Sequence, residues 1–461
     1  MLFNSFEFIF VFLPIVLLSF FTVSLSRRYL LSRVVLVLGS LFFYGYWDYR
    51  YLPLILFSIV VNYALGILLS RKQSRMLLTL GLTVNLALLG YFKYVGFFIE
   101  NINAVLGYTL ADPHIVLPLA ISFFTFQQIA YLVDSYRQLT REYDFVSYSL
   151  FVCFFPQLIA GPIVHHKEIL PQFKEAACYL FLHENFAKGI FIFFFALFKK
   201  VVIADTLALW ATPGFDQATE LSFIEAWGTI LSYTFQIYFD FSAYSEMALG
   251  LGLMCNIKIP VNFRSPYKAN NIVDFWRRWH ITLSRFLRDY LYIPLGGNRK
   301  GKGRRYVNLM LTMLLGGLWH GAGWTFVIWG GLHGLYLILN HGVRATKIQV
   351  HWMIGRLATF LAVLLSWVFF RATDFEAAIK VCRGLVGLSG FKLGSLHYFP
   401  GRYTELVALP LLFLIVNFAP NTLEVAEKMQ PDRKWALLTA VIIVCCIANM
   451  NKVSEFIYFQ F

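Results

Sequence analysis

The chain has 461 residues, of which 59% are hydrophobic, 18% aromatic and only 14% charged. About a quarter of the residues of a soluble domain are charged, and a bilayer can cover apolar surface that a water-soluble fold of this composition cannot bury. The composition therefore excludes an ordinary soluble protein and predicts an integral membrane protein. The six cysteines form no Cys-x-x-Cys pair, so we expect buried apolar side chains and no metal site.

The first apolar run covers residues 6–26. No basic stretch precedes it and no small-residue cleavage pattern follows it, which predicts a retained membrane helix rather than a signal peptide. Arg27, Arg28 and Arg33 come directly afterwards. Because cytoplasmic loops collect Lys and Arg, we predict an outward-facing, periplasmic N-terminus.

Apolar runs then recur to the end of the chain, and a membrane-crossing helix needs about 20 residues. Runs 34–47 and 356–370 are short enough to be tilted, re-entrant or buried, whereas 222–254 and 306–340 are long enough to hold two segments each. We expect an all-α polytopic membrane protein of roughly 11–13 helices, forming one membrane-embedded domain over residues 1–461. The remaining runs are 51–70, 77–98, 115–134, 147–164, 187–208, 404–419 and 435–450.

The segment 264–305 is strongly basic. Its eleven Lys and Arg residues face only Asp274 and Asp289, so it carries +9 of the total net charge of +14. Such a bias predicts a cytoplasmic-side segment. The charge could also attract a polyanionic donor such as a coenzyme A thioester. Nucleic acid is excluded as a partner, because these charges lie between membrane segments rather than on a soluble module.

Two histidines stand out. His320 lies in an otherwise apolar run with glycines on both sides, including Gly321, which allows close approach of a backbone or a thin ligand. Its imidazole suits proton abstraction near neutral pH, although a histidine satisfied by a neighbouring carbonyl fits the run equally well. His280 follows an aromatic and basic stretch typical of a membrane interface. We expect structural roles for His333 and His341.

These segments carry a resemblance. The stretches 279–284 and 319–321 resemble the signature of the membrane-bound O-acyltransferase superfamily. Four further stretches resemble its bacterial branch, that of alginate O-acetyltransferase AlgI, peptidoglycan O-acetyltransferase PatA and the teichoic acid D-alanylation protein DltB. The resemblance extends from the N-terminus to the last residue. The four stretches are Leu117–Gln127, Phe154–Ile163, Tyr238–Ser245 and Asp289–Asn298.

The resemblance implies a ring of tilted helices around a central funnel or tunnel, with His320 as principal catalytic residue and His280 close to it. It implies a cytoplasmic thioester as donor, acetyl-CoA above all, with an acyl-carrier protein as the alternative, and no bound cofactor. It also implies a multi-pass protein of the bacterial inner membrane. The residues expected to line the donor site or tunnel are Arg278, Trp279, Ser284, Trp319 and Gly321.

The C-terminal segment 451–461 is an aromatic tail. Aromatic residues at a membrane interface explain such a composition without a catalytic role. The ending also resembles the terminal motif of the small DltX protein that accompanies DltB, which implies Tyr458 as an acyl carrier. A phenol ionises near pH 10, so Tyr458 would need a positioned base such as His320.

The final acceptor implied by the resemblance is an extracytoplasmic polysaccharide of the alginate, peptidoglycan or cellulose type. No soluble domain is long enough to act on such a polymer, so we expect a second protein to complete the transfer, and the resemblance implies a periplasmic SGNH-type acetyltransferase as that partner. The alternative function is a proton-coupled transporter or flippase that uses intramembrane histidines as relays. Asp240 and Glu246 are the main carboxylates within predicted spans. No repeated half is visible, which favours the enzyme.

Overall fold

A computed structural model describes residues 1–140, 143–391, 398, 401, 403–430, 432–450, 456 and 457. These residues form helices and connecting turns, with no strand among them. Five helical segments of the described chain are long and apolar enough to cross a bilayer. The all-α, polytopic class predicted from the sequence is therefore confirmed. The five segments are Phe8–Leu25, Tyr49–Arg71, Arg75–Leu106, Trp324–Ala345 and Trp352–Arg371.

The chain divides into two compact units that alternate along the sequence. Unit 1 comprises Met1–Leu197, Tyr244–Val261 and Met429–Glu455. Unit 2 comprises Phe198–Ala243, Asn262–Lys428 and Phe456–Phe461. That both belong to one membrane-embedded domain, with a funnel at its centre, stays a prediction.

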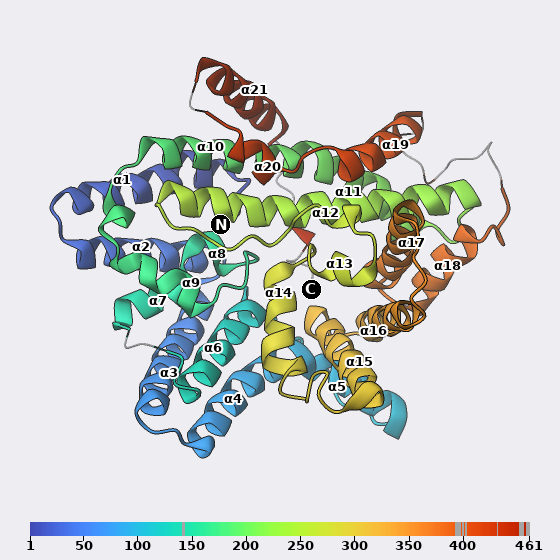
Figure 1. Ribbon diagram of the computed structural model, residues 1–461, viewed down its shortest axis with the longest axis horizontal. Helices are drawn as coiled ribbons and strands as arrows, with labels where there is room; N and C mark the ends of the chain where they lie inside the picture. Colours follow the sequence, from blue (N-terminus) through green and yellow to red (C-terminus); the bar gives the residue numbers. More distant parts are fainter. Residues whose placement is uncertain are drawn as a thin grey trace. The chain divides into compact units, whose positions relative to one another are not determined.

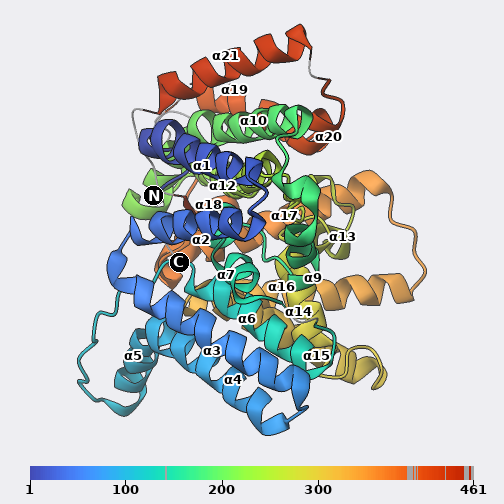
Figure 2. The same cartoon turned by 90° about the vertical axis from the view of Figure 1, so that its left-hand side faces the viewer.

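Unit 1 contains two groups of packed helices. One joins α1 to α2, and α2 to α7; the other brings α3, α4 and α6 side by side (Figure 2). Its helices are α1 (Leu13–Leu25), α2 (Tyr29–Gly45), α3 (Leu52–Arg71), α4 (Arg75–Leu89), α5 (Val95–Leu106), α6 (Ile121–Tyr136), α7 (Phe145–Cys153), α8 (Phe155–Leu158), α9 (His166–Ile169), α10 (His183–Phe198) and α21 (Arg433–Asn449).

Unit 2 is built around the helical hairpin of α15 and α16, which pack along their length (Figure 1). Most of α12 (Phe223–Met254) belongs to this unit, and its last residues belong to unit 1. The other helices are α11 (Asp205–Thr212), α13 (Ile272–Trp276), α14 (Ile281–Leu287), α15 (Gly301–His320), α16 (Trp324–Ala345), α17 (Trp352–Arg371), α18 (Phe375–Leu385), α19 (Tyr403–Phe418) and α20 (Thr422–Glu427).

Short polar side chains fix where many of these helices begin. In several helices, the side chain of the residue before the first turn accepts a hydrogen bond from a backbone N–H of that turn. These capping residues include Ser74 before α4, Asp144 before α7, Asn271 before α13, Asp374 before α18 and Asp432 before α21. Those N–H groups have no partner within the helix, so each cap stabilises its helix by about 1 kcal/mol.

Some helices of the structure coincide with the apolar runs of the sequence, and others do not. Run 222–254 is the single helix α12, of 32 residues. Run 306–340 holds two helices, separated by residues 321–323. The stretch 147–164 is not one helix, because α7 ends at Cys153 and Pro156 lies in the first turn of α8, where its missing N–H costs no hydrogen bond. Run 356–370 belongs to α17, whose 20 residues suffice for a crossing.

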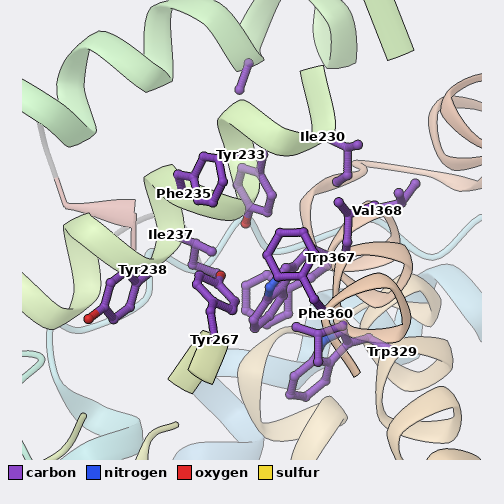
Figure 3. Packing of buried hydrophobic residues seen from close by; sticks show 14 of the residues in the cluster. Ile230, Tyr233, Phe235, Ile237, Tyr238, Tyr267, Trp329, Phe360, Trp367 and Val368 are labelled. Atoms are coloured by element: carbon purple, nitrogen blue, oxygen red, sulfur yellow. The ribbon is translucent and has the colours of Figure 1, made fainter. Parts of the chain in front are cut away.

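The centre of unit 2 is an aromatic core (Figure 3). Trp329 of α16 and Trp367 of α17 stack with ring centroids 5.9 Å apart, and Tyr267 meets Phe360 edge-on at 5.5 Å. Aromatic pairs in these arrangements stabilise a core beyond the effect of burial alone. Aromatic side chains of this unit pack against the rings of His280 and His320.

Candidate active site

His280 occupies the position just before α14 and is fully buried. Its backbone is in the left-handed region, with φ 43° and ψ 53°, which non-glycine residues rarely adopt. Asn262 holds this turn in place. Its carbonyl oxygen accepts the N–H of Ile281 (3.0 Å), and its Oδ1 accepts the N–H and the hydroxyl of Thr282 (3.2 and 2.9 Å).

The same Asn262 oxygen fixes the protonation of the imidazole. Oδ1 lies 3.2 Å from Nδ1 of His280. Because this atom already accepts a backbone N–H, it is an oxygen, and Nδ1 must donate to it. Burial lowers the pKa of His280 to about 3, and His280 lies in the predicted cytoplasmic-side segment rather than in a spanning run. The ring is therefore neutral, with Nε2 as its acceptor nitrogen.

His320 is the last residue of α15 and is 4% exposed. Aromatic rings enclose it: the centroids of Trp319, Trp329 and Phe370 lie 5.0, 5.0 and 5.3 Å from that of the imidazole. The centroid of the His280 ring lies 6.2 Å away. The structure therefore brings together the two histidines that the sequence analysis selected, although they are forty positions apart.

Glycines let the α15–α16 hairpin close directly behind His320. A Cβ atom at Gly330 would lie 2.2 Å from the carbonyl oxygen of Met313, and one at Gly317 would lie 2.2 Å from that of Phe326. At Gly321, immediately after His320, a Cβ atom would lie 2.1 Å from the ring of Phe326. Only residues without a side chain permit this approach of the two helix backbones.

A cavity of about 490 Å³ opens in the same unit. Ile281, next to His280, and Met313, two turns before His320, both line it, so each histidine-bearing element contributes to its wall. The guanidinium-bearing residues Arg277, Arg285 and Arg288 lie around it. The remaining lining residues are Val273, Trp276, Ser284, Leu287, Tyr292, Leu309, Thr312 and Leu337. The cavity thus combines an apolar lining with cationic groups, which suits a ligand that has both an apolar and an anionic part.

The other predicted site residues differ in their surroundings. Ser284 lines the cavity, and its hydroxyl donates to the carbonyl of Trp279 (3.4 Å). Trp279 is 1% exposed and packs in the aromatic core, 4.9 Å from Trp367 between centroids. Arg278 pairs with Asp274 at 3.0 Å. Tyr458 lies outside the described residues.

Trp319 and Gly321 are the direct neighbours of His320 in the sequence, so both lie beside it in the structure. Of the histidines expected to be structural, His333 is fully buried among rings, 4.8 Å from Trp329 between centroids. Sequence reasoning missed Asn262, because no motif marks an asparagine eighteen positions before the histidine it orients. It also passed over the cavity arginines Arg277, Arg285 and Arg288 as individual candidates.

A separate histidine pair lies in unit 1. Nε2 of His165 and Nε2 of His166 are 2.8 and 3.1 Å from the same Oδ2 of Asp134, and these three atoms lie close enough together to hold a metal ion. The sequence shows no metal-ligand spacing here and predicted no metal site. Nδ1 of His165 accepts the N–H of Lys167 (3.3 Å), which places the proton of the neutral ring on Nε2. A protonated nitrogen donates to Asp134 rather than binding a metal.

Comparison with known proteins places this geometry in context. The sequence model of the MBOAT, membrane-bound O-acyltransferase family, matches residues 133–373, which include both His280 and His320. The chain is 46% identical to a peptidoglycan O-acetyltransferase of Helicobacter pylori, over 100% of this chain and 98% of the relative. It is 36% identical to a probable alginate O-acetylase AlgI of Pseudomonas putida, over the full length of both.

A more distant similarity links the chain to a teichoic acid D-alanyltransferase of Streptococcus thermophilus. The identity is 26%, over 55% of this chain and 68% of the relative. The similarity therefore includes relatives named for transferring different acyl groups to different polymers.

Proposed function

Because the chain belongs to the membrane-bound O-acyltransferase family, we propose that it takes an acetyl group from a cytoplasmic thioester and passes it across the inner membrane for O-acetylation of a polysaccharide. The names of the relatives at 46% and 36% identity support an acceptor of the peptidoglycan or alginate type. The observation that carries the proposal is the buried pair of imidazoles, 6.2 Å apart between centroids, on elements that also contribute Ile281 and Met313 to a cavity with arginines in its lining.

His320 acts as the general base in this proposal. It takes the proton of an attacking hydroxyl while the oxygen attacks the thioester carbonyl, and the new C–O bond forms as the C–S bond breaks. The thiolate leaves and takes up the proton, so the products are an ester and a free thiol. General base catalysis of this kind accelerates a reaction by about 10²–10⁴-fold. Neutral His280 supports the step, because Nε2 can accept a hydrogen bond while Asn262 holds Nδ1.

The cavity supports a pantetheine thioester as donor. Its apolar lining suits the thin chain of pantetheine, and Arg277, Arg285 and Arg288 suit the phosphates that follow it. Acetyl-CoA and an acyl-carrier protein both present this phosphopantetheine arm. Acetyl-CoA is the donor we propose, because the strongly basic 264–305 segment would attract its additional phosphates.

Tyr458 is the proposed first acceptor, and a periplasmic SGNH-type acetyltransferase is the proposed partner that moves the acetyl group from the acyl-tyrosine to the polymer. The proposed orientation is supported by the positive charge of 264–305 and of the loop after the first helix, which favours the cytoplasmic side for both and the outer side for the N-terminus. The acyl group would then enter from the cytoplasm and leave on the outer side.

Mass analysis of the C-terminal peptide tests the proposal. Full-length protein purified in detergent is incubated with acetyl-CoA, and free thiol and acetylated Tyr458 are quantified together. We expect both to form with wild-type protein, and both to be lost in His320→Gln. In Tyr458→Phe the acetylated peptide must vanish. Thiol release with an unmodified Tyr458 peptide in the wild type would contradict the acyl-tyrosine step.

The same preparation distinguishes the transporter alternative. Proteoliposomes of wild type and His320→Gln are compared for proton-coupled solute uptake and for thiol release. The enzyme predicts thiol release that depends on His320. Proton-coupled uptake without any thiol release would contradict acyl transfer and favour the transporter.

A further inference from the structure

A buried ion pair in unit 2, between Lys200 and Asp240, has no role in the proposed acyl transfer by His320 and His280. Nζ of Lys200 lies 2.6 Å from Oδ2 of Asp240 and 2.8 Å from Oδ1 of Asp205. The side chains of Lys200 and Asp240 are 2% and 3% exposed. Charges are costly to remove from water, so such a pair in an apolar protein calls for a specific role. Lys200 also lies in a π-helical segment, Lys199–Ala204, a local geometry that is frequent at functional sites.

Both members of the pair contact the C-terminal tail. The second oxygen of Asp240, Oδ1, accepts the backbone N–H of Ile457 at 3.2 Å. The ring of Phe456 lies over Nζ of Lys200, 4.7 Å from the centroid, in a cation–π contact. Phe456 and Ile457 are 1% and 4% exposed, and Ile457 belongs to the aromatic core of unit 2. Two residues near the end of the chain are thus held inside the protein.

The division of the Asp240 carboxylate makes these contacts interdependent. One oxygen serves Lys200 and the other serves the N–H of Ile457. An asparagine at position 240 has one acceptor oxygen for two donors, so its amide group would face a donor on one side. The hydrogen bond from the N–H of Ile457 fixes the position of the backbone beside Asp240. The contact of the Phe456 ring with Lys200 fixes the register, that is, which residue of the tail lies beside the ion pair.

We propose that Lys200 and Asp240 form a clamp that positions the C-terminal tail for acyl transfer. Ile457 directly precedes the proposed acceptor Tyr458, and consecutive Cα atoms are about 3.8 Å apart, so docking of Ile457 would limit the distance that the phenol has to search. A released tail would sample many positions, and the effective concentration of its phenol at the base would fall. Lys200 and Asp240 are positioning residues in this account. The effect on transfer rests on the proposed function, whereas tail docking does not.

Hydrogen–deuterium exchange of the C-terminal peptide in full-length protein measures docking without requiring activity. We expect slow exchange in the wild type and at least tenfold faster exchange in Asp240→Asn. Phe456→Leu leaves Lys200 and Asp240 unchanged and keeps an apolar side chain in the tail, and it should show the same increase. Asp205→Asn is the matched control: Asp205 contacts Lys200 but makes no described contact with Phe456 or Ile457, so exchange should stay within twofold.

Transfer to Tyr458 is measured on the same variants. The clamp predicts at least a tenfold lower rate at saturating acetyl-CoA in Asp240→Asn and Phe456→Leu, with the KM for acetyl-CoA unchanged. Unchanged exchange in both variants would overturn the clamp, whatever the activity. Faster exchange with an unchanged rate of thiol release would support the docking contact and contradict Tyr458 as acceptor, so the two failures are distinguishable.

Discussion

Each unit of the molecule contains a pair of neighbouring histidines, and the two pairs differ in the groups to which they are hydrogen-bonded. In unit 1, His165 and His166 both contact one oxygen of Asp134, with Lys167 at 3.7 Å from the same atom. In unit 2, the rings of His280 and His320 lie among aromatic side chains, and Nδ1 of His280 donates to the neutral amide of Asn262.

The difference shows that burial and pairing do not by themselves make a histidine a catalyst. In unit 1, the carboxylate of Asp134 forms charge-assisted hydrogen bonds with Nε2 of His165 and of His166. These nitrogens are therefore occupied and are not available to accept a proton from a substrate. In unit 2, His280 has a neutral ring with a defined tautomer, and the elements that bear the two histidines also contribute to the wall of a cavity. We therefore expect chemistry from unit 2 and stability from unit 1.

The largest expected effect comes from His320→Gln. Losing a general base should lower acyl transfer by about 10³-fold, within the 10²–10⁴-fold range of this kind of catalysis. Thiol release from acetyl-CoA measures the rate. His341→Gln, on α16, is the matched control, and its rate should be that of the wild type. Equal rates in the two variants would exclude His320 as the general base.

His280 should show the next largest effect. Replacing it removes the hydrogen bond that Nε2 is proposed to accept during the reaction; a hydrogen bond to a charged group contributes about 1.5–3 kcal/mol, or roughly tenfold to hundredfold in rate. Glycine adopts the left-handed backbone at this position, where φ is 43°, at a lower energetic cost than alanine. His280→Gly should therefore fold better than His280→Ala, as gel filtration can show, while both lose transfer. Wild-type activity in His280→Gly would exclude a role for the ring.

A stability effect should distinguish two adjacent glycines of α16. Gly330→Ala places a methyl group 2.2 Å from the Met313 carbonyl oxygen, whereas the nearest atom at Gly331, on Leu314, is 3.5 Å away. Overpacking costs about 1–3 kcal/mol. We expect a lower Tm in detergent for Gly330→Ala and an unchanged Tm for Gly331→Ala. Equal values would mean that the hairpin behind His320 is not closely packed.

The smallest effect on transfer belongs to unit 1. Asp134→Asn should keep the acyl-transfer rate within about twofold and lower the free energy of unfolding by about 1.5–3 kcal/mol, the net value of a hydrogen bond to a charged group. Elemental analysis of the purified protein is the companion measurement. A stoichiometric metal lost in Asp134→Asn would show that Asp134, His165 and His166 form a metal site rather than a hydrogen-bonded contact.

Much of the helical layout could be predicted from the sequence, because apolar length is a strong signal in a membrane protein. The break after His320 is also visible, since Gly321 and Gly323 interrupt the run there. The continuity of α12 and the end of α7 at Cys153 were not predicted. Both depend on where turns are tolerated by the packing around them, which hydropathy does not report.

The candidate site was predictable only in part. His280 and His320 could be paired because both lie in motifs that resemble one family. The contacts that orient or position the reacting groups join residues far apart in the sequence, such as Asn262 with His280 and Asp240 with Ile457. No local pattern marks these partners. Adjacent lysines at 199 and 200 within an apolar run were the available signal for the buried ion pair.

The central claim is that the imidazole of His320 meets a thioester donor. A bromoacetyl thioester of pantetheine tests it most directly, because it presents the arm shared by coenzyme A and acyl-carrier proteins and places an alkylating carbon where the acetyl methyl would be. Peptide mass analysis should find the alkyl group on His320, with bromide released and with protection by acetyl-CoA. Labelling confined to other residues, or unaffected by acetyl-CoA, would contradict the account.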